Sequence, residues 1–206
     1  MTDVELFKYL KHKNDYDTLP DNFQYKVEVN DADKRIYCFF EESQQRSDWV
    51  TNLSAFPTHW NYGMWWVHGG YKKAWKKHKY TVLDTVRKFA ESHLDYTVCF
   101  CGWSYGGAIA LLAAVSWYEE VGIYKPLLIT FGAPKVVLGS STMKYFRHCI
   151  SPCSKQYIHR SDPVPLFPLL LPWKHILPVK VGKFNGYNKE YHSSYDEVLI
   201  SKLTEE

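Results

Sequence analysis

Ser104 is the residue in this sequence best suited to covalent chemistry. It lies in the segment CGWSYGG at residues 101–107, with glycines two positions away on either side. The resulting pattern, Gly-x-Ser-x-Gly, is typical of a sharp turn that presents a serine hydroxyl for attack on a carbonyl carbon. The same five residues also suit a glycine-rich turn that only lets a helix pack closely. Residues elsewhere in the chain must therefore decide between the two interpretations.

A serine hydroxyl is a poor nucleophile near neutral pH, so it needs a base and a group that orients that base. In proteins that carry Gly-x-Ser-x-Gly, the acid and then the histidine follow the serine along the chain. Downstream, HRSDPVP contains Asp162 and YHSSYDEV contains His192. Prolines follow Asp162 closely and end the segment there, and His192 lies in a polar stretch. These two residues are the candidate acid and base.

The chain around these residues alternates between two patterns. Short apolar or β-branched runs predict strands, and apolar positions repeating every three or four residues predict helices. The predicted strands are 23–30, 35–42, 97–102, 125–132, 156–162 and 175–182, and the predicted helices are 3–13, 72–94, 108–122 and 195–203. This alternation predicts an α/β fold with a largely parallel sheet. Ser104 falls between a strand and a helix, as a nucleophile turn requires.

Further segments extend the pattern. In chain order they are DWVTNL at 48–53, VHGGY at 67–71, GWSYGGA at 102–108, TFGAPKV at 130–136, DPVP at 162–165, KHILP around His175 and HSSY at 192–195. As an ordered set, over roughly residues 35–200, they resemble the class 3 lipases, the fungal-lipase-like branch of the α/β-hydrolases. The resemblance implies an α/β-hydrolase fold, with a mostly parallel central sheet flanked by helices. We expect residues 1–206 to form one such domain.

The resemblance also implies roles for individual residues. Ser104, Asp162 and His192 correspond to a catalytic triad. The hydroxyl and backbone N–H of Ser43, at the end of FEES, and the backbone N–H of Tyr105 correspond to an oxyanion hole. For Ser43, an ordinary polar residue at the end of a strand remains an alternative.

Other titratable residues are weaker candidates. His68 and His175 match structural histidines of the family, and Asp95 precedes the strand that leads to Ser104. The chain also departs from the family pattern. Glu41 and Glu42 replace an Arg-Gly pair before Ser43, which puts negative side chains near a site that must stabilise negative charge. Bulky Trp103 and Tyr105 flank the nucleophile in place of His and Leu.

Two segments are unusually apolar. The family has a lid after the oxyanion strand, and here the corresponding segment, about 48–66, is rich in tryptophan and other large apolar residues. Such a lid-like aromatic segment suits an acyl chain or a lipid surface. The run VPLFPLLLPW at 164–173 is interrupted by prolines. It fits either buried packing or the lining of an acyl groove.

Composition excludes several other classes of protein. The formal net charge of +3 among 206 residues is too small to indicate nucleic-acid binding. No apolar run reaches the roughly 18 residues of a transmembrane helix, and the N-terminus has no signal-like apolar stretch. The five cysteines form no disulfide framework. We therefore expect a cytoplasmic protein with reduced thiols. The lysine-rich segment at 72–80 fits a solvated helix face or weak attraction to anionic lipid.

A zinc site is not expected. His148, Cys149, Cys153 and His159 have zinc-binding side chains, but their spacing fits no common zinc finger, and Pro152 prevents a regular helix there. The chemistry inferred above requires neither a metal nor an organic cofactor.

The sequence therefore predicts a serine-dependent hydrolase of lipid esters that acts through an acyl-enzyme, with possible contact to a lipid surface. Acyl transfer to an acceptor other than water would use the same residues. The alternative from another class is a catalytically silent lipid-binding module with the same fold, which the glutamates at 41 and 42 motivate.

Overall fold

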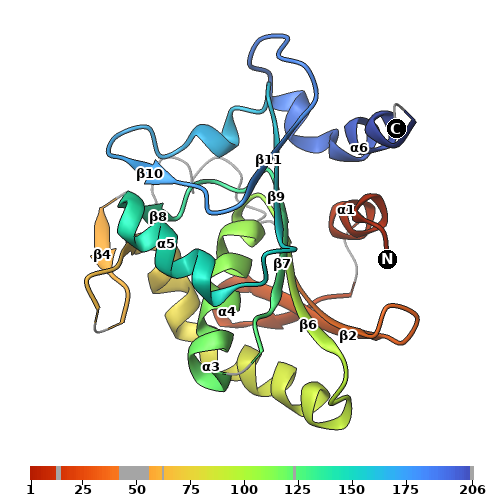
Figure 1. Ribbon diagram of the computed structural model, residues 1–206, viewed down its shortest axis with the longest axis vertical. Helices are drawn as coiled ribbons and strands as arrows, with labels where there is room; N and C mark the ends of the chain where they lie inside the picture. The colour runs from red at the N-terminus through yellow and green to blue at the C-terminus, as the bar shows by residue number, and fades with distance from the viewer. Residues whose placement is uncertain (13–14, 42–55, 62, 123, 205–206) are drawn as a thin grey trace.

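A seven-stranded sheet forms the centre of the molecule (Figure 1). The computed structural model describes residues 1–12, 15–41, 56–61, 63–122 and 124–204. The strands, in spatial order, are β1 (Asp17–Leu19), β2 (Phe23–Asn30), β3 (Arg35–Phe40), β6 (Thr97–Trp103), β7 (Leu127–Phe131), β9 (Lys155–His159) and β11 (Pro178–Val181). From β3 to β11 every neighbouring pair is parallel, and β1, β2 and β3 pair antiparallel. The predicted α/β fold with a mostly parallel sheet is confirmed.

Helices cover both faces of this sheet. In Figure 1, α3 (Gly69–Ser92), α4 (Tyr105–Val121) and α5 (Gly139–Cys149) lie on one side, and α1 (Asp3–Lys11) and α6 (Tyr195–Thr204) lie on the other. Two apolar cores result, because successive side chains of a strand point to opposite faces. In β3, Ile36, Cys38 and Phe40 enter the core under α3 and α4. Tyr37 and Phe39 enter the core under α1 and α6.

Helix α4 is buried on nearly all sides. Every residue from Gly106 to Trp117 is buried, which explains why AIALLAAV lacks the polar stripe of a surface helix. The helix begins at Tyr105, three residues before the predicted start at 108, so that Ser104 directly precedes it. Gly122, in the left-handed conformation, ends it as predicted.

A smaller antiparallel sheet lies beside α5. Its strands, in spatial order, are β10 (Trp173–Lys174), β8 (Val137–Leu138), β5 (Trp66–His68) and β4 (Pro57–His59). Strands β4 and β5 pair antiparallel, with Pro57 opposite His68 and His59 opposite Trp66. Residues 42–55, which include Ser43 and the first part of the predicted lid, lie outside the described residues.

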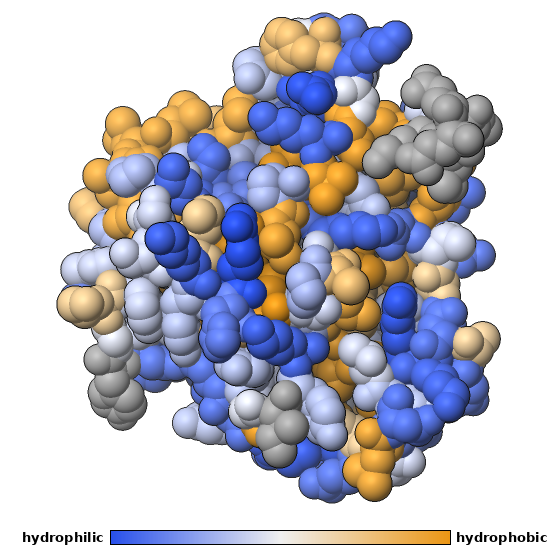
Figure 2. All heavy atoms as spheres, in the orientation of Figure 1, coloured by the Kyte–Doolittle hydropathy of each residue, from blue (hydrophilic) through white to orange (hydrophobic). Residues whose placement is uncertain are grey.

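An exposed apolar patch borders this smaller sheet. Figure 2 shows hydrophobic residues gathered at its upper left, over the segment that leads into β10 in Figure 1. Leu169, Leu170 and Leu171 are all exposed, Leu170 by 82%. Buried packing is thus the wrong interpretation for this part of 164–173, although Pro165 and Trp173 are buried.

The turn from β6 into α4 depends on close backbone contacts. A Cβ at Gly102 would collide with the carbonyl group of Gly106 and lie 2.6 Å from the nitrogen of Gly107. A Cβ at Gly106 would collide with the carbonyl oxygen of Phe40 in β3. The strand, the helix and the neighbouring strand approach this closely only because these positions carry no side chain.

We therefore expect Gly102→Ala to lower the free energy of unfolding by about 3 kcal/mol or more, since fixed backbone atoms must move. Gly122→Ala is the matched control. Its Cβ would meet nothing within 4 Å. This substitution should therefore lower the free energy of unfolding by only roughly 1–2 kcal/mol, the cost of holding an alanine in the left-handed conformation. Urea unfolding measures both values. Equal costs for the two variants would show that the turn at Gly102 is not sterically restricted.

Candidate active site

Ser104 occupies the junction between β6 and α4. Its backbone has φ 55° and ψ −124°, which side-chain-bearing residues rarely adopt. Its N–H donates to the carbonyl oxygen of Phe131 at 2.9 Å, which ties the turn to β7. The side chain is fully buried, and Oγ makes no hydrogen bond to any described residue. A strained serine at the N-terminus of a buried helix is the geometry expected of a nucleophile turn.

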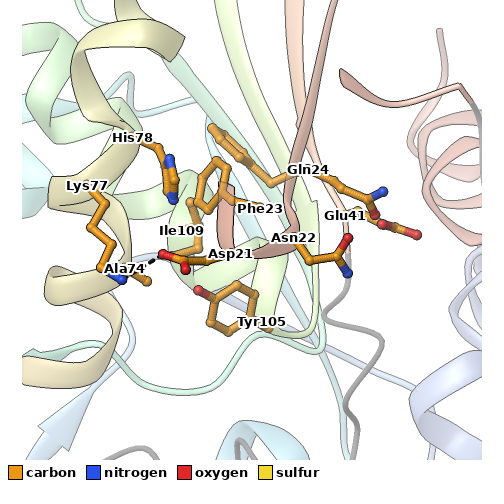
Figure 3. Close-up of a pocket in the computed structure, with 11 residues that line it drawn as sticks. Asp21, Asn22, Phe23, Gln24, Glu41, Ala74, Lys77, His78, Tyr105 and Ile109 are labelled. Atoms are coloured by element: carbon orange, nitrogen blue, oxygen red, sulfur yellow. Dashed lines mark hydrogen bonds and ion pairs between the residues drawn. The ribbon is translucent and has the colours of Figure 1, made fainter. Parts of the chain in front are cut away.

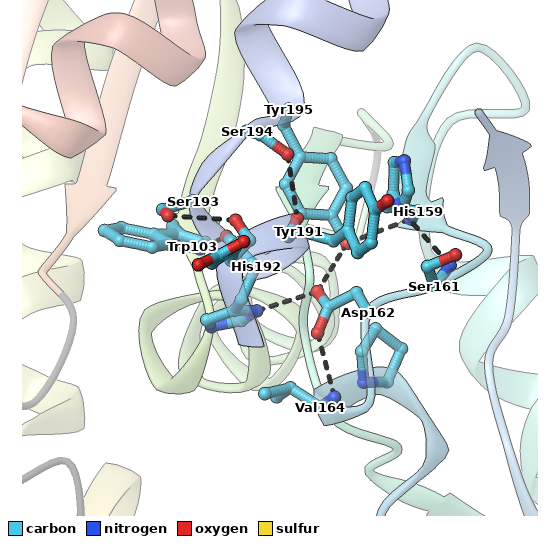
Figure 4. Close-up of polar contacts among 12 residues, drawn as sticks. Trp103, His159, Ser161, Asp162, Val164, Tyr191, His192, Ser193, Ser194 and Tyr195 are labelled. Atoms are coloured by element: carbon cyan, nitrogen blue, oxygen red, sulfur yellow. Dashed lines mark hydrogen bonds and ion pairs between the residues drawn. The ribbon is translucent and has the colours of Figure 1, made fainter. Parts of the chain in front are cut away.

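Asp162 and His192 lie in direct contact. Asp162 follows β9, and His192 belongs to the short 3₁₀ helix η3 (Lys189–Ser193). His192 Nδ1 is 2.7 Å from Asp162 Oδ2. The same carboxylate accepts hydrogen bonds from the hydroxyl of Tyr195 at 2.7 Å and from the N–H of Val164 at 2.9 Å (Figure 4). The carboxylate is thus buried, held in position by three contacts and directed at the imidazole.

Two further residues connect this pair to the serine turn. Trp103, the residue before Ser104, donates its Nε1–H to the carbonyl oxygen of His192 at 2.9 Å. The two rings lie 5.4 Å apart between centroids. Directly after β7, a Cβ at Gly132 would lie 2.8 Å from both Asp162 Oδ2 and the His192 ring. Gly132 follows Phe131, which accepts the Ser104 hydrogen bond, so the three candidate residues gather around the end of β7.

The role of Tyr195 is the main feature that sequence reasoning missed. Its segment HSSY was noted, but only as part of the resemblance. The Tyr195 side chain is fully buried, and its hydroxyl oxygen also accepts a hydrogen bond from the N–H of His159 at 3.0 Å. Burial and the nearby Asp162 carboxylate raise the pKa of Tyr195, which keeps the hydroxyl protonated as a donor. The spacing of three between His192 and Tyr195 was the available signal.

The predicted oxyanion donors are only partly within the described residues. Tyr105 is the first residue of α4, so its N–H belongs to the positive end of the helix dipole. Ser43 and Glu42 lie outside the described residues. Glu41 is half-buried at the end of β3, and its N–H donates to the carbonyl oxygen of Gln24 at 3.3 Å.

The weaker sequence candidates lie elsewhere. Asp95 forms an ion pair with Lys34 and stands at the start of β6, at the opposite end of that strand from Ser104. His175 Nε2–H donates to the carbonyl oxygen of Pro165 at 2.9 Å. Burial lowers the pKa of His175 to about 4 and that of His68 likewise to about 4. Both imidazoles are therefore neutral near pH 7 and serve packing.

The described residues contain no group of three or more His, Cys, Asp or Glu side chains arranged to hold a metal ion. His148 and His159, from the zinc-like set, have other neighbours. The first lies against Tyr118 and the second is stacked on Tyr191. No helix within the described part of the chain is long and apolar enough to cross a membrane.

Comparison with known proteins points to one family. Residues 37–171 match the family model described as Lipase (class 3). Lipase A of Sodiomyces alcalophilus is 27% identical over 146 residues, which are 65% of this chain and 34% of that protein. The secreted mono- and diacylglycerol lipase 2 of Gibberella zeae is 30% identical over 113 residues, which are 50% of this chain and 27% of that protein. The chain thus spans about a third of the length of such relatives.

Solved structures agree on the fold. The native Rhizomucor miehei lipase propeptide complex superposes with a TM-score of 0.74 and 24% identity, over 81% of this chain and 55% of that one. A triacylglycerol lipase, described as having a serine protease triad as its catalytic centre, superposes with a TM-score of 0.73 and 25% identity. The match covers 81% of this chain and 64% of that one. The predicted α/β-hydrolase fold is confirmed by these neighbours.

The lowered pKa of His68 predicts how stability depends on pH. The His68 ring is buried, and its Nδ1 has no hydrogen-bond partner among the described residues. In the unfolded chain this histidine binds a proton near pH 6.5, whereas in the folded protein it does so only near pH 4. Stability is therefore lost as pH falls through this window, by about 1.4 kcal/mol per pH unit for one such group.

Accordingly, His68→Phe should make the plot of unfolding free energy against pH shallower between about pH 6 and 4.5. The change in slope should approach the value for one proton, about 1.4 kcal/mol per pH unit. Denaturant unfolding at closely spaced pH values measures it. Identical slopes for the variant and the unmodified protein would mean that His68 titrates alike in both states.

Proposed function

The chain belongs to the class 3 lipase family, and from that premise we propose that it hydrolyses carboxylic esters of lipids through Ser104. The observation that carries the proposal is the buried contact between His192 Nδ1 and Asp162 Oδ2, at 2.7 Å, beside the strained turn of Ser104. This arrangement supplies an orienting acid and a base next to the hydroxyl that most resembles a nucleophile.

The proposed first step forms an acyl-enzyme. Asp162 accepts a hydrogen bond from Nδ1–H of His192, so that Nε2 is the basic nitrogen of the imidazole. Nε2 takes the hydroxyl proton of Ser104 as Oγ bonds to the ester carbonyl carbon. The imidazolium then gives that proton to the departing alcohol oxygen as the carbon–oxygen bond breaks. The buried carboxylate stabilises the positive charge that the imidazole carries between these events.

Water completes the cycle by the same route. Nε2 of His192 takes a proton from water, the hydroxide oxygen bonds to the acyl carbon, and Ser104 leaves with the proton restored. In both steps the carbonyl oxygen becomes negatively charged. The N–H of Tyr105, at the positive end of α4, and the N–H and hydroxyl of Ser43 are the proposed donors, each worth roughly 10²–10³ in rate.

We further propose that the exposed leucine segment, Leu169–Leu171, contacts the lipid surface that supplies the substrate. It lies between Pro168 and Pro172, a few residues after Asp162. The ammonium group of Lys135 donates to the carbonyl oxygen of Leu166 at 2.5 Å, which places positive charge next to the segment. Apolar side chains beside a cation suit an anionic lipid interface.

The lysine-rich start of α3 is a weaker candidate for this contact. Lys77 is paired with Asp21 at 2.6 Å and Lys79 with Glu120 at 3.1 Å. Lys72 donates to the carbonyl oxygen of His59. Because Lys77 and Lys79 are paired with carboxylates within the protein, the leucine segment carries the proposal.

The double variant Leu169→Ser/Leu170→Ser should weaken binding to phosphatidylcholine–phosphatidylserine vesicles about tenfold or more, since two apolar side chains no longer leave water. Leu94→Ser is the matched control, because Leu94 is 87% exposed but follows α3, away from the segment. Vesicle co-sedimentation measures binding. Equal weakening by both changes would place the contact elsewhere or show it to be nonspecific.

A catalytically silent lipid-binding module is the second candidate. The observation that favours it is Glu41, a carboxylate half-buried at the end of β3 where the proposed oxyanion strand ends. Negative charge there opposes the developing oxyanion. Such a module would bind lipid equally well with and without Ser104 and would turn over no ester.

A cytoplasmic location is also proposed, since all five cysteines are free thiols. The name of the Gibberella zeae relative describes that protein as secreted. Fractionation of expressing cells distinguishes the two locations, because a secreted protein would accumulate in the medium.

Replacement of the nucleophile gives the direct test of hydrolysis. Ser104→Ala should lower kcat/KM for a p-nitrophenyl ester and for an emulsified acylglycerol by at least about 10³-fold, since no other group can form the acyl-enzyme. Ser141→Ala, an exposed serine on α5, should leave both values unchanged. Activity that survives in Ser104→Ala would overturn the proposed mechanism. No activity in the unmodified protein, with lipid binding retained, would favour the silent module.

A further inference from the structure

Two bulky residues flank the proposed nucleophile, and their side chains lie on opposite sides of the central sheet. Tyr105 packs against the core under α3 and α4, where it lines a cavity of about 140 Å³ together with Phe23 and Ile109 (Figure 3). Trp103 belongs to the other core, under α1 and α6. On that side its ring lies 5.4 Å from the ring of His192, between centroids. Trp103 is thus a neighbour of the nucleophile whose side chain reaches the proposed base.

The indole of Trp103 is attached to the backbone of the proposed base. Its Nε1–H donates to the carbonyl oxygen of His192 at 2.9 Å, and the two side chains lie beside one another (Figure 4). Trp103 is only 5% exposed, so water has little access to compete for this bond. The bond joins the residue before Ser104 to the residue that carries the imidazole. It therefore ties the proposed base to β6, the strand that presents the nucleophile.

The segment that carries His192 is short and makes local hydrogen bonds. Helix η3 has five residues, and the hydrogen bonds of a 3₁₀ helix are weaker than those of an α-helix. The N–H of Tyr191 and the hydroxyl of Ser193 both donate to carbonyl groups within residues 188–193. These bonds shape the turn but do not place it on the sheet. Contacts with other elements place it, and the bond from Trp103 is one of them.

Two fixed points determine where the basic nitrogen of His192 lies. The hydrogen bond to Asp162 holds Nδ1, but by itself it lets the ring and its backbone pivot about that contact. The bond from Trp103 holds the carbonyl group of the same residue. With both ends held, Nε2 has little freedom left. Proton transfer needs a separation of about 3 Å, so a displacement of Nε2 by about 1 Å would slow the reaction strongly.

Helix α1 packs against the indole. Phe7 is fully buried, and its ring meets the ring of Trp103 edge-on, with centroids 5.7 Å apart. Phe7 also lies 5.5 Å from the ring of Tyr195, which donates to Asp162. Edge-to-face aromatic contacts favour particular ring orientations as well as burying area. One side chain of α1 thus supports both the residue that holds the proposed base and a residue that holds the proposed acid.

We propose that Trp103 is a positioning residue for ester hydrolysis: its N–H holds the backbone of His192 so that Nε2 stays within reach of the Ser104 hydroxyl. Phe7 keeps the indole in the orientation that makes this bond. The role rests on the proposed function, since positioning matters only to a reaction that uses His192. The effect of the bond on the imidazole can nevertheless be measured without turnover.

An isostere removes the N–H and keeps the ring. 3-Benzothienylalanine, introduced at position 103 of the full chain, has the shape of tryptophan with sulfur in place of the indole N–H. Its rate of reaction with a fluorophosphonate ester should fall at least about tenfold, the size expected for losing one buried neutral hydrogen bond. Trp103→Phe should react at least as slowly. An isostere that reacts at the unmodified rate would overturn the proposal.

Trp75→Phe is the matched control for these measurements. Trp75 is 1% exposed and donates its Nε1–H to Ser116 Oγ at 2.9 Å, in the core under α3 and α4. The control therefore loses the same ring atoms and one buried hydrogen bond, away from His192. It should react with the fluorophosphonate at the unmodified rate, although urea unfolding should show a loss of stability similar to that of Trp103→Phe.

Steady-state kinetics separate positioning from a general loosening of the fold. Since Trp103 is buried, its replacement should lower kcat for a p-nitrophenyl ester and leave KM unchanged. Phe7→Leu should lower kcat in the same way, because the indole loses its support from α1. Phe146→Leu is its control, as Phe146 is also fully buried but lies in the other core. An equal fall in kcat in both controls would overturn the proposal.

Proton NMR tests the positioning independently of hydrolysis. The Nδ1–H proton of His192, hydrogen-bonded to Asp162, should give a downfield resonance that is absent in His192→Ala. It should stay sharp in Trp75→Phe and broaden or disappear in the isostere, because a loosened η3 lets this proton exchange with water. If the unmodified protein hydrolyses no ester, the proposed function is contradicted, and the resonance alone decides the role of Trp103. An equally sharp resonance in the isostere, or none in the unmodified protein, would overturn that role.

Discussion

The structure depends on the close approach of three backbone segments where β6 turns into α4. The absence of side chains at Gly102, Gly106 and Gly107 lets the helix begin directly after Ser104 and lie against the end of β3. This approach forces Ser104 into a strained backbone conformation with a positive φ, at the positive end of a buried helix. The apolar character of α4 follows from the same constraint, since a helix held this close to the sheet has no face left for water.

The polar side of the site is assembled from segments far apart in sequence. Asp162 is buried after β9, yet it contacts His192 in η3, Tyr195 at the start of α6 and the backbone of Val164. A buried carboxylate is stable only when its oxygens receive hydrogen bonds. These contacts therefore explain why the irregular chain between β11 and α6 has a defined path over the end of the sheet. Packing of α6 against α1, in the second apolar core, fixes the tyrosine that completes the set.

Much of this arrangement was predictable from local sequence patterns. The strands at 23–30, 35–42, 97–102 and 125–132 and the order of Ser104, Asp162 and His192 all follow from short sequence segments. Helix α5 and the smaller sheet were not predicted, since GSSTMKYFRHC is short and opens with Gly-Ser-Ser, residues typical of turns, and two-residue strands such as β8 exist through their partners. The true start of α4 was missed because glycines at 106 and 107 disfavour a helix unless tertiary packing requires them. The contact of Tyr195 with Asp162 depends on three-dimensional proximity, which no spacing rule specifies.

The central claim is that Ser104 is a nucleophile activated by His192, and a fluorophosphonate ester probe tests it most directly. The purified protein would be incubated with the probe in detergent, and the adduct located by mass spectrometry of its peptides. The account predicts one phosphonate on Ser104, strongly reduced in His192→Ala and unaffected in His175→Ala, whose histidine is neutral and packed away from the serine turn. A folded protein that takes up no phosphonate, or one that is labelled equally without His192, would contradict it.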